Sequence, residues 1–216
     1  MTDTVTTTLD LLRHGEPVGG SRYRGQIDDP LSDKGWGQMR SAVGDAHPWD
    51  RIISSPLTRC SDFARELATR HALPLDLEPR LMELGFGTWE GRTAQELMRT
   101  DADILARFWR DPLHHTPPGA ETLPAFEARV VAAWNDLLTQ HRGQRLLLVC
   151  HAGVIRLLLS HALAMPLAHL FRIQVPNAGL SRLRVDHHLD GLLPRLIFHA
   201  GSLEKTPESM TETITL

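Results

Sequence analysis

Arginine and histidine side chains come directly after segments that the sequence predicts to be strands. Arg13 and His14 end the first of these segments, and His151 follows the unbroken apolar run 146–150. Arg59 lies at the start of the helix that follows the predicted strand 50–54. Two guanidinium groups beside two imidazoles would repel one another unless an anion lay between them. Because the planar guanidinium fork suits oxyanions such as phosphate, this set predicts a binding site for a phosphoryl group.

The same charges predict the state of the histidines. Nearby cations disfavour a second positive charge, so the imidazole of His14 is expected to be neutral. A neutral imidazole is a competent nucleophile, and arginines can stabilise charge on a transferring phosphoryl group. Arg59 lies in the first turn of its helix, where unpaired backbone N–H groups also favour negative charge. Taken singly, each residue has an ordinary interpretation as a chance tripeptide, a solvated helix residue or a buried histidine; only their convergence indicates chemistry.

Alternating strands and helices must bring these residues together. The sequence predicts strands ending near residue 14 and at 50–54, 75–77, 146–150, 180–185 and 193–199, with helices between most of them. Ser55-Pro56 is interpreted as a capping serine followed by proline at the first helical position. This order predicts an α/β fold, a three-layer sandwich with a mainly parallel central sheet. The carboxyl ends of parallel strands meet at one edge, where sites form.

Length and composition limit the class of protein. The 216 residues suit one domain, expected over 1–201, with a lid-like insertion at about 92–124 and a mobile tail at 202–216. A net charge of −3 argues against a general nucleic-acid binder. No apolar run approaches the roughly 20 residues of a membrane span, and Met1–Leu9 lacks the features of a secretory signal. We therefore expect a cytoplasmic protein with no nucleic-acid or membrane partner, and leave its oligomeric state open.

Four segments, in order along the chain, resemble the motifs of one family. They are Leu12–Glu16 (LRHGE), Ser54–Arg59 (SSPLTR), Glu83–Gly91 (ELGFGTWEG) and Val149–Gly153 (VCHAG). Together they are similar to the signature of the histidine phosphatase superfamily, the phosphoglycerate-mutase-like proteins. The resemblance implies a phosphoglycerate-mutase-like fold with a short lid, and a small phosphorylated substrate.

The resemblance also implies roles for individual residues. His14 would carry the phosphoryl group as phosphohistidine before water removes it. Arg13, Arg59 and His151 would hold the phosphoryl oxygens. Glu83 would protonate the leaving alkoxide and then activate water, a task for which a carboxyl pKa near neutrality is best.

Two points in these motifs stay open. Glu90 is a rival to Glu83 as the acid, although the spacing within the loop favours Glu83 and suggests a structural role for Glu90. Mutases of the family usually carry an asparagine six residues after the nucleophile, where this chain has Gly20. Arg22 or Arg24 would be the replacement donor, and the sequence does not decide between them.

The segments around Gly25–Ser32 and Lys34–Met39 resemble those of the α-ribazole phosphatases within this superfamily. That likeness implies hydrolysis of α-ribazole 5′-phosphate in adenosylcobalamin biosynthesis, with Gly25 and Gln26 as further substrate contacts beside the two arginines. A broad-specificity sugar-phosphate or nucleotide phosphatase is the alternative. A phosphoglycerate mutase is disfavoured because the stretch from Glu83 to His151 is shorter than in the glycolytic mutases.

The lid segment carries Phe108, Trp109, His114 and His115, whose role the sequence leaves open. The aromatic pair is interpreted either as a contact to the benzimidazole of the substrate or, with more weight, as packing of the lid onto the body. Neighbouring histidines cannot easily share one ion without further ligands, so no metal and no cofactor is expected.

Overall fold

One sheet organises the chain. The computed structural model describes residues 5–203, and within them six strands pair in the order β3-β2-β4-β1-β5-β6. The strands are β1 (Val5–Arg13), β2 (Arg51–Ser54), β3 (Leu75–Leu77), β4 (Arg145–Cys150), β5 (Leu180–His188) and β6 (Gly191–Gly201). The pairs from β3 to β1 are all parallel, while β5 is antiparallel to both of its neighbours. The prediction of a mainly parallel central sheet is confirmed.

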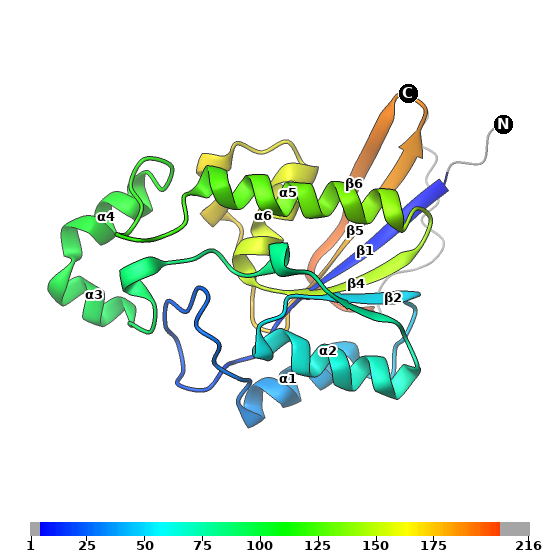
Figure 1. Cartoon of the computed structure of the whole chain (residues 1–216), viewed down its shortest axis with the longest axis horizontal. Coiled ribbons are helices and arrows are strands. Elements are labelled where there is room, and N and C mark those ends of the chain that lie inside the picture. The colour runs from blue at the N-terminus through cyan, green and yellow to red at the C-terminus, as the bar shows by residue number, and fades with distance from the viewer. Residues whose placement is uncertain (1–4, 204–216) are drawn as a thin grey trace.

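Helices cover both faces of the sheet (Figure 1). The helices are α1 (Asp33–Val43), α2 (Thr58–His71), α3 (Ala94–Thr100), α4 (Ala102–Arg110), α5 (Leu123–Gln140) and α6 (Ala152–Ala162), with 3₁₀ turns at Pro79–Leu81, Gly87–Trp89 and Leu167–Arg172. Helices α5 and α6 pack on one face, and α1 and α2 pack on the other. The three-layer prediction is confirmed.

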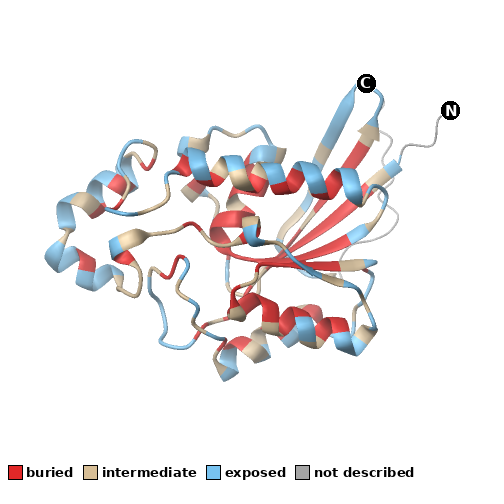
Figure 2. Cartoon of the chain, in the orientation of Figure 1, coloured by how far each residue is buried: buried red, intermediate tan, exposed pale blue. Residues whose placement is uncertain are grey.

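Strand β4 lies at the centre because both of its faces are apolar. Leu146, Leu148 and Cys150 face the α5/α6 layer, while Leu147 and Val149 face the α1/α2 layer. All five are at most 1% exposed, and Figure 2 shows the buried residues concentrated along the central strands and on the helix surfaces that face them. An unbroken apolar run is therefore the signature of a strand covered on both sides.

The register brings three strand ends to one edge. Arg13 of β1 is paired with Cys150 of β4, and Ser54 of β2 with Val149. Beyond the strands the backbone continues this pairing: the His14 N–H donates to the Cys150 carbonyl at 3.0 Å, and the Ser55 N–H donates to the Val149 carbonyl at 3.0 Å. The chain thus leaves all three strands at the same height, as the topology requires for a site at the carboxyl edge.

The predicted start of α2 is wrong in its detail. The helix begins at Thr58 after Leu57, which has no side-chain cap, and not at Ser55-Pro56. The hydroxyl of Ser55 instead lies 2.8 Å from Nε2 of His151. Asp28, from a distant loop, accepts a 2.6 Å hydrogen bond from the Thr58 N–H. A tertiary contact therefore satisfies the helix end that local capping was expected to satisfy.

Helices α3 and α4 project from the body of the molecule (Figure 1). The predicted capping box at the start of α3 is present, with Thr93 and Glu96 bonded to each other's backbone N–H groups. An apolar cluster of Trp89, Leu97, Leu105 and Phe108, with Tyr23, Phe86, Ile104 and Phe171 at its edge, joins these helices to the body. Apart from its first two residues, the tail predicted at 202–216 lies outside the described residues. Among residues 5–203, no helix has the length and apolar character that a membrane span requires.

Candidate active site

His14 is held with one ring nitrogen free. The side chain is 6% exposed, and its Nδ1 lies 2.7 Å from the Gly15 carbonyl oxygen. Because a carbonyl only accepts hydrogen bonds, Nδ1 carries the proton and Nε2 has its lone pair available. Burial, followed by the charges of Arg59 and Arg13, lowers the pKa of His14 well below its usual value. The expectation of a neutral imidazole is confirmed, and its geometry suits a nucleophile at Nε2.

His151 lies beside His14 at the end of β4. The two ring centroids are 5.2 Å apart at an interplanar angle of 64°. His151 is fully buried, and burial together with the charge of Arg59 lowers its pKa well below the usual range. Both imidazoles are therefore neutral near pH 7, and each can offer one donor or acceptor without adding positive charge.

Two arginines approach the histidines, and neither forms an ion pair with a carboxylate of residues 5–203. Arg59, 1% exposed, donates to the carbonyls of Ile27 and Gly25 at 2.6 and 2.7 Å. Arg13 donates to the Val175 carbonyl at 2.6 Å. Among residues 5–203, the buried Nε of each arginine has no hydrogen-bond partner. Buried donors are normally satisfied, so two unpartnered guanidinium nitrogens in residues that line one cavity favour an anion as the occupant.

A cavity of about 610 Å³ opens over these groups. It is lined by Arg13, His14, Glu16, Pro17, Gly20, Ser21, Arg22, Tyr23, Arg24, Gly25, Lys34, Gln38, Arg59, Glu83, Phe86, Pro176 and Asn177. His151 is not part of its lining and lies behind His14 as a fully buried neighbour. The cationic side chains outnumber the acidic ones, which favours an anionic occupant.

Glu83 reaches the same cavity from the loop after the 3₁₀ turn Pro79–Leu81. Its Oε1 accepts from the Leu84 N–H at 2.9 Å, and its Oε2 accepts from the Gly153 N–H at 3.1 Å at the start of α6. Arg129 of α5 holds the loop by donating to the carbonyls of Met82 and Glu83 at 2.7 and 3.0 Å. A carboxyl group is therefore fixed at the edge of the cavity from two sides.

Glu90, the rival carboxylate, has a different environment. Its Oε1 accepts from the backbone N–H groups of Gln26 and Phe86 at 3.0 and 2.9 Å. It does not line the cavity. Glu90 therefore ties two loops together, as the spacing of the motif suggests.

Comparison with known proteins now decides the family. The sequence pattern of the histidine phosphatase superfamily (branch 1) matches residues 9–192. The chain belongs to the histidine phosphatase superfamily. The match includes strands β2 to β5, most of β1, and every residue of the site described above.

The relatives of this chain carry several names. The adenosylcobalamin/alpha-ribazole phosphatase of Salmonella typhimurium is 34% identical over 155 residues, covering 65% of this chain and 77% of that protein. The bifunctional protein Rv2228c of Mycobacterium tuberculosis is 34% identical over 148 residues, covering 66% of this chain and only 40% of that protein. The solved structure of mycobacterial glucosyl-3-phosphoglycerate phosphatase Rv2419c aligns with a TM-score of 0.79 at 27% identity, covering 90% of this chain and 99% of that one.

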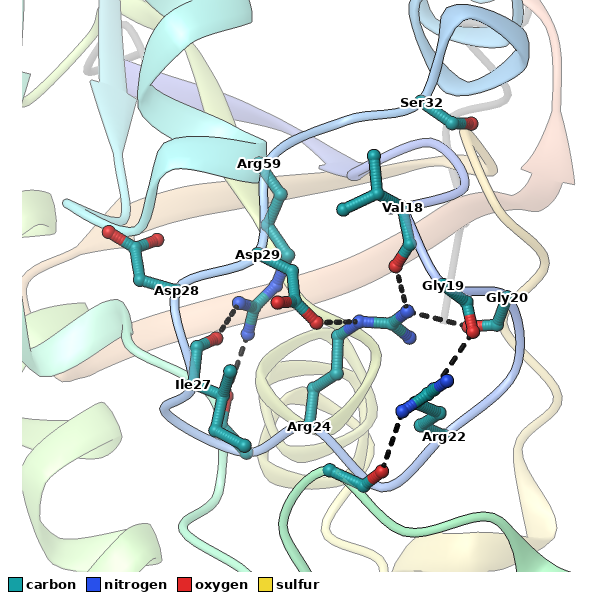
Figure 3. Close-up of polar contacts among 12 residues, drawn as sticks. Val18, Gly19, Gly20, Arg22, Arg24, Ile27, Asp28, Asp29, Ser32 and Arg59 are labelled. Carbon is teal, nitrogen blue, oxygen red and sulfur yellow. Dashed lines mark hydrogen bonds and ion pairs between the residues drawn. The ribbon is translucent and has the colours of Figure 1, made fainter.

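Arg22 and Arg24, between which the sequence did not decide, have different surroundings in the structure (Figure 3). Arg24 is 9% exposed, donates to the carbonyls of Val18 and Gly20 at 2.6 Å and to Asp29 at 3.0 Å. Arg22 is exposed and donates to the carbonyls of Gly19 and Gly91 at 2.9 and 3.1 Å. Arg24 therefore shapes the loop around Gly20, whereas Arg22 is the more accessible donor at the cavity rim.

Gly25 and Gln26, which were also expected to contact the substrate, differ in their position relative to the cavity. Gly25 lines the cavity with a φ of +53°, and a Cβ there would overlap the carboxylate of Glu90. Gln26 does not line the cavity; its side-chain amide lies 3.5 Å from the Glu83 carbonyl. Gly25 is therefore at the site, and Gln26 supports the loop that carries Glu83.

Tyr23 and Phe86 line the cavity, although the sequence motifs did not predict them as site residues. Of the aromatic pair in the lid segment, Phe108 is 1% exposed inside the apolar cluster. Trp109 is 51% exposed and does not line the cavity. Trp109 donates to the Tyr23 hydroxyl at 3.2 Å. The one signal available was that Tyr23 is the single tyrosine of the chain and lies between two arginines.

Proposed function

We propose that this histidine phosphatase is a phosphoric monoester hydrolase that works through a phosphohistidine at His14. The observation that carries the proposal is the neutral His14 with Nε2 free, next to two arginines with unpartnered Nε atoms. The imidazole supplies the nucleophile, and the arginines supply donors for charge that develops on the phosphoryl oxygens.

In the first step Nε2 of His14 attacks the phosphorus as the ester P–O bond breaks. Glu83, protonated at this point, gives its proton to the leaving oxygen, which departs as an alcohol. The positive charge on the imidazole is stabilised by the hydrogen bond from Nδ1–H to the Gly15 carbonyl. Backbone carbonyls hold both arginines in place before substrate binds, so their donors need little reorganisation.

In the second step a water molecule attacks the phosphohistidine. Glu83, now a carboxylate, takes a proton from that water, the P–N bond breaks, and its electron pair returns to Nε2. Inorganic phosphate leaves and both groups regain their starting forms. The same carboxyl group therefore serves as acid and then as base.

For the substrate we propose α-ribazole 5′-phosphate, within a class of phosphate monoesters that carry an aromatic ring. Tyr23 and Phe86 offer an apolar wall inside the cavity, suited to a flat ring. The likeness to proteins named adenosylcobalamin/alpha-ribazole phosphatase supports the same choice.

A second candidate substrate has its own support. Arg22 adds positive charge at the outer part of the cavity, where Lys34 is also present but forms a 2.8 Å ion pair with Glu16. A substrate with a second anionic group, such as a glucosylated phosphoglycerate or another sugar phosphate, would suit this side. The solved mycobacterial relative bears such a name.

The deciding experiment measures phosphate release from α-ribazole 5′-phosphate, glucosyl-3-phosphoglycerate, simple sugar phosphates and phosphoglycerates, with acid-labile phosphohistidine trapped in parallel. We expect release and a labile adduct in the native chain, and neither in His14→Ala. The variant His115→Ala is the control. A native chain that releases phosphate with no adduct at His14 would exclude the mechanism, and similar kcat/KM for every ester would exclude α-ribazole phosphate as the preferred substrate.

A further inference from the structure

The hydrogen-bond partner of His151 is a serine hydroxyl. His151 follows β4 and precedes α6, and its Nε2 lies 2.8 Å from Oγ of Ser55, which follows β2. Both side chains are fully buried. With a single proton on the neutral ring, the nitrogen that carries it determines which nitrogen can donate to a ligand.

The surroundings of Ser55 decide where that proton lies. Its Oγ accepts from the Leu57 N–H at 3.4 Å, and the backbone N–H of Ser55 is itself used by the Val149 carbonyl. Among the described residues, Nε2 of His151 is the acceptor within reach of the Ser55 hydroxyl proton. If Nε2 carried the ring proton, that buried hydroxyl proton would have no acceptor, which is costly.

Among the described residues, the ring of His151 has one further side-chain hydrogen-bond neighbour, a sulfur that is about equally far from both nitrogens. Sγ of Cys60 lies 3.6 Å from Nε2 and 3.8 Å from Nδ1, and its own proton is directed at the Cys150 carbonyl at 3.4 Å. A thiol sulfur is a weak acceptor, so it does not compete strongly for a ring N–H. Nδ1 is therefore the nitrogen that is left to carry the ring proton.

We propose that Ser55 is a positioning residue: its hydroxyl donates to Nε2 of His151, keeps the ring proton on Nδ1 and holds the ring beside His14. This role rests on the proposed function, because the position of His151 affects hydrolysis only if His14 carries the phosphoryl group. Ser55 itself does not touch the substrate. It acts in the way that outer partners of metal-bound histidines do, by fixing tautomer and ring orientation.

Ser54 supplies a matched control. It is the neighbour of Ser55 and is equally buried, yet its Oγ donates to backbone carbonyls, those of Ser55 at 2.9 Å and Val149 at 3.5 Å. Both serine-to-alanine changes remove one buried hydroxyl from the same strand end. Only the change at position 55 removes a partner of His151.

The first test is the tautomer of His151 in the ligand-free chain, read by long-range ¹⁵N–¹H NMR with the His151 signals assigned by their loss in His151→Gln. We expect the Nδ1–H form in the native chain and in Ser54→Ala, and a mixed or Nε2–H form in Ser55→Ala. An Nε2–H form in the native chain, or an unchanged tautomer in Ser55→Ala, would overturn the proposal. This readout needs no activity, so it stands even if the proposed hydrolysis fails.

The second test compares kinetics and phosphate affinity. Ser55→Ala should lower kcat/KM by about 10- to 100-fold and weaken inorganic phosphate binding, as loss of an orienting partner does at other sites. Ser55→Thr, which keeps the hydroxyl, should recover part of the loss, and Ser54→Ala should change kcat/KM less than about threefold. Equal losses in the two alanine variants would mean that the effect is packing, and the positioning role would be wrong.

Discussion

The inner and outer parts of the cavity are built in different ways. His14, Arg59 and His151 are at most 6% exposed and come from the ends of strands or the start of a helix. Arg22 and Tyr23 belong to the long loop after β1, and Arg22 is exposed and donates to one carbonyl of its own loop and one of the loop at Gly91. The comparison indicates that the sheet fixes the histidines and arginines around the nucleophile, while loops carry Glu83 and the groups that would distinguish substrates.

The largest expected effect comes from replacing an arginine by lysine in the inner part of the cavity and, for comparison, in the outer part. Arg59→Lys keeps the charge but cannot reproduce the planar fork that bonds Gly25 and Ile27, so its Nε donor is also lost. We expect kcat/KM on a small aryl phosphate to fall by about 10²–10³-fold. Arg22→Lys at the rim should lower it by less than about threefold.

Both variants should be measured at equal folded fraction, checked by circular dichroism. If Arg22→Lys lowers kcat/KM as much as Arg59→Lys does, the distinction between a chemical inner part and a selective rim is wrong.

The next effect tests the placement of Glu83. A Cβ at position 153 would overlap Oε1 of Glu83, and the Gly153 N–H is one of the two donors that hold this carboxylate. Gly153→Ala should therefore displace the carboxyl group and lower kcat by about 10²-fold, the scale of general acid–base catalysis. Gly37→Ala in α1, where a Cβ would meet nothing within 4 Å, is the control and should keep full activity.

The kinetic pattern of Gly153→Ala is diagnostic. Displacement of the acid should lower kcat more for esters with poor leaving groups than for aryl esters, because a good leaving group needs less protonation. Equal losses on both kinds of ester would argue against Glu83 as the acid.

The inner part could be predicted from sequence because its signals are local to strand ends. Arg13, His14 and His151 follow apolar runs, and parallel topology then forces them to one edge. The cap of α2 could not be predicted, since Asp28 reaches Thr58 from a distant loop. Tyr23 and Phe86 were also missed, because which aromatic residue of a loop faces a cavity depends on packing that periodicity does not encode.

Burial of the two neutral histidines predicts a pH dependence of stability. The pKa values of His14 and His151 are lowered in the folded chain, so the unfolded chain binds protons first as the pH falls below about 6.5. The contribution to stability is therefore present above that pH and lost below it. We expect the free energy of unfolding, from urea titrations, to fall by up to about 1.4 kcal/mol per pH unit for each of these histidines.

His14→Ala should make this dependence shallower between pH 6.5 and 5, and His115→Ala should leave it unchanged. The exposed position of His115 makes it a suitable comparison. Inorganic phosphate, by offering an anion to the cationic edge, should oppose the loss. An identical slope in His14→Ala would mean that other groups cause the pH dependence.

The smallest effect concerns the contact between α4 and the rim. Trp109 is 51% exposed, and its Nε1–H donates to the Tyr23 hydroxyl at 3.2 Å while its ring packs against Phe108 and Phe171. Trp109→Phe keeps an aromatic ring but removes the donor, a loss worth about 0.5–1 kcal/mol at an exposed site. We expect KM for a monoester with a bulky aromatic group to rise by about two- to fivefold, because Tyr23 is less firmly placed. The kcat on a small aryl phosphate should be nearly unchanged.

Met98→Ala, also exposed on the projecting helices, is the control for a general loosening of this region. A fall in kcat on the small ester would show that α4 affects the residues around His14. The distinction between the inner and the outer part of the cavity would then be wrong.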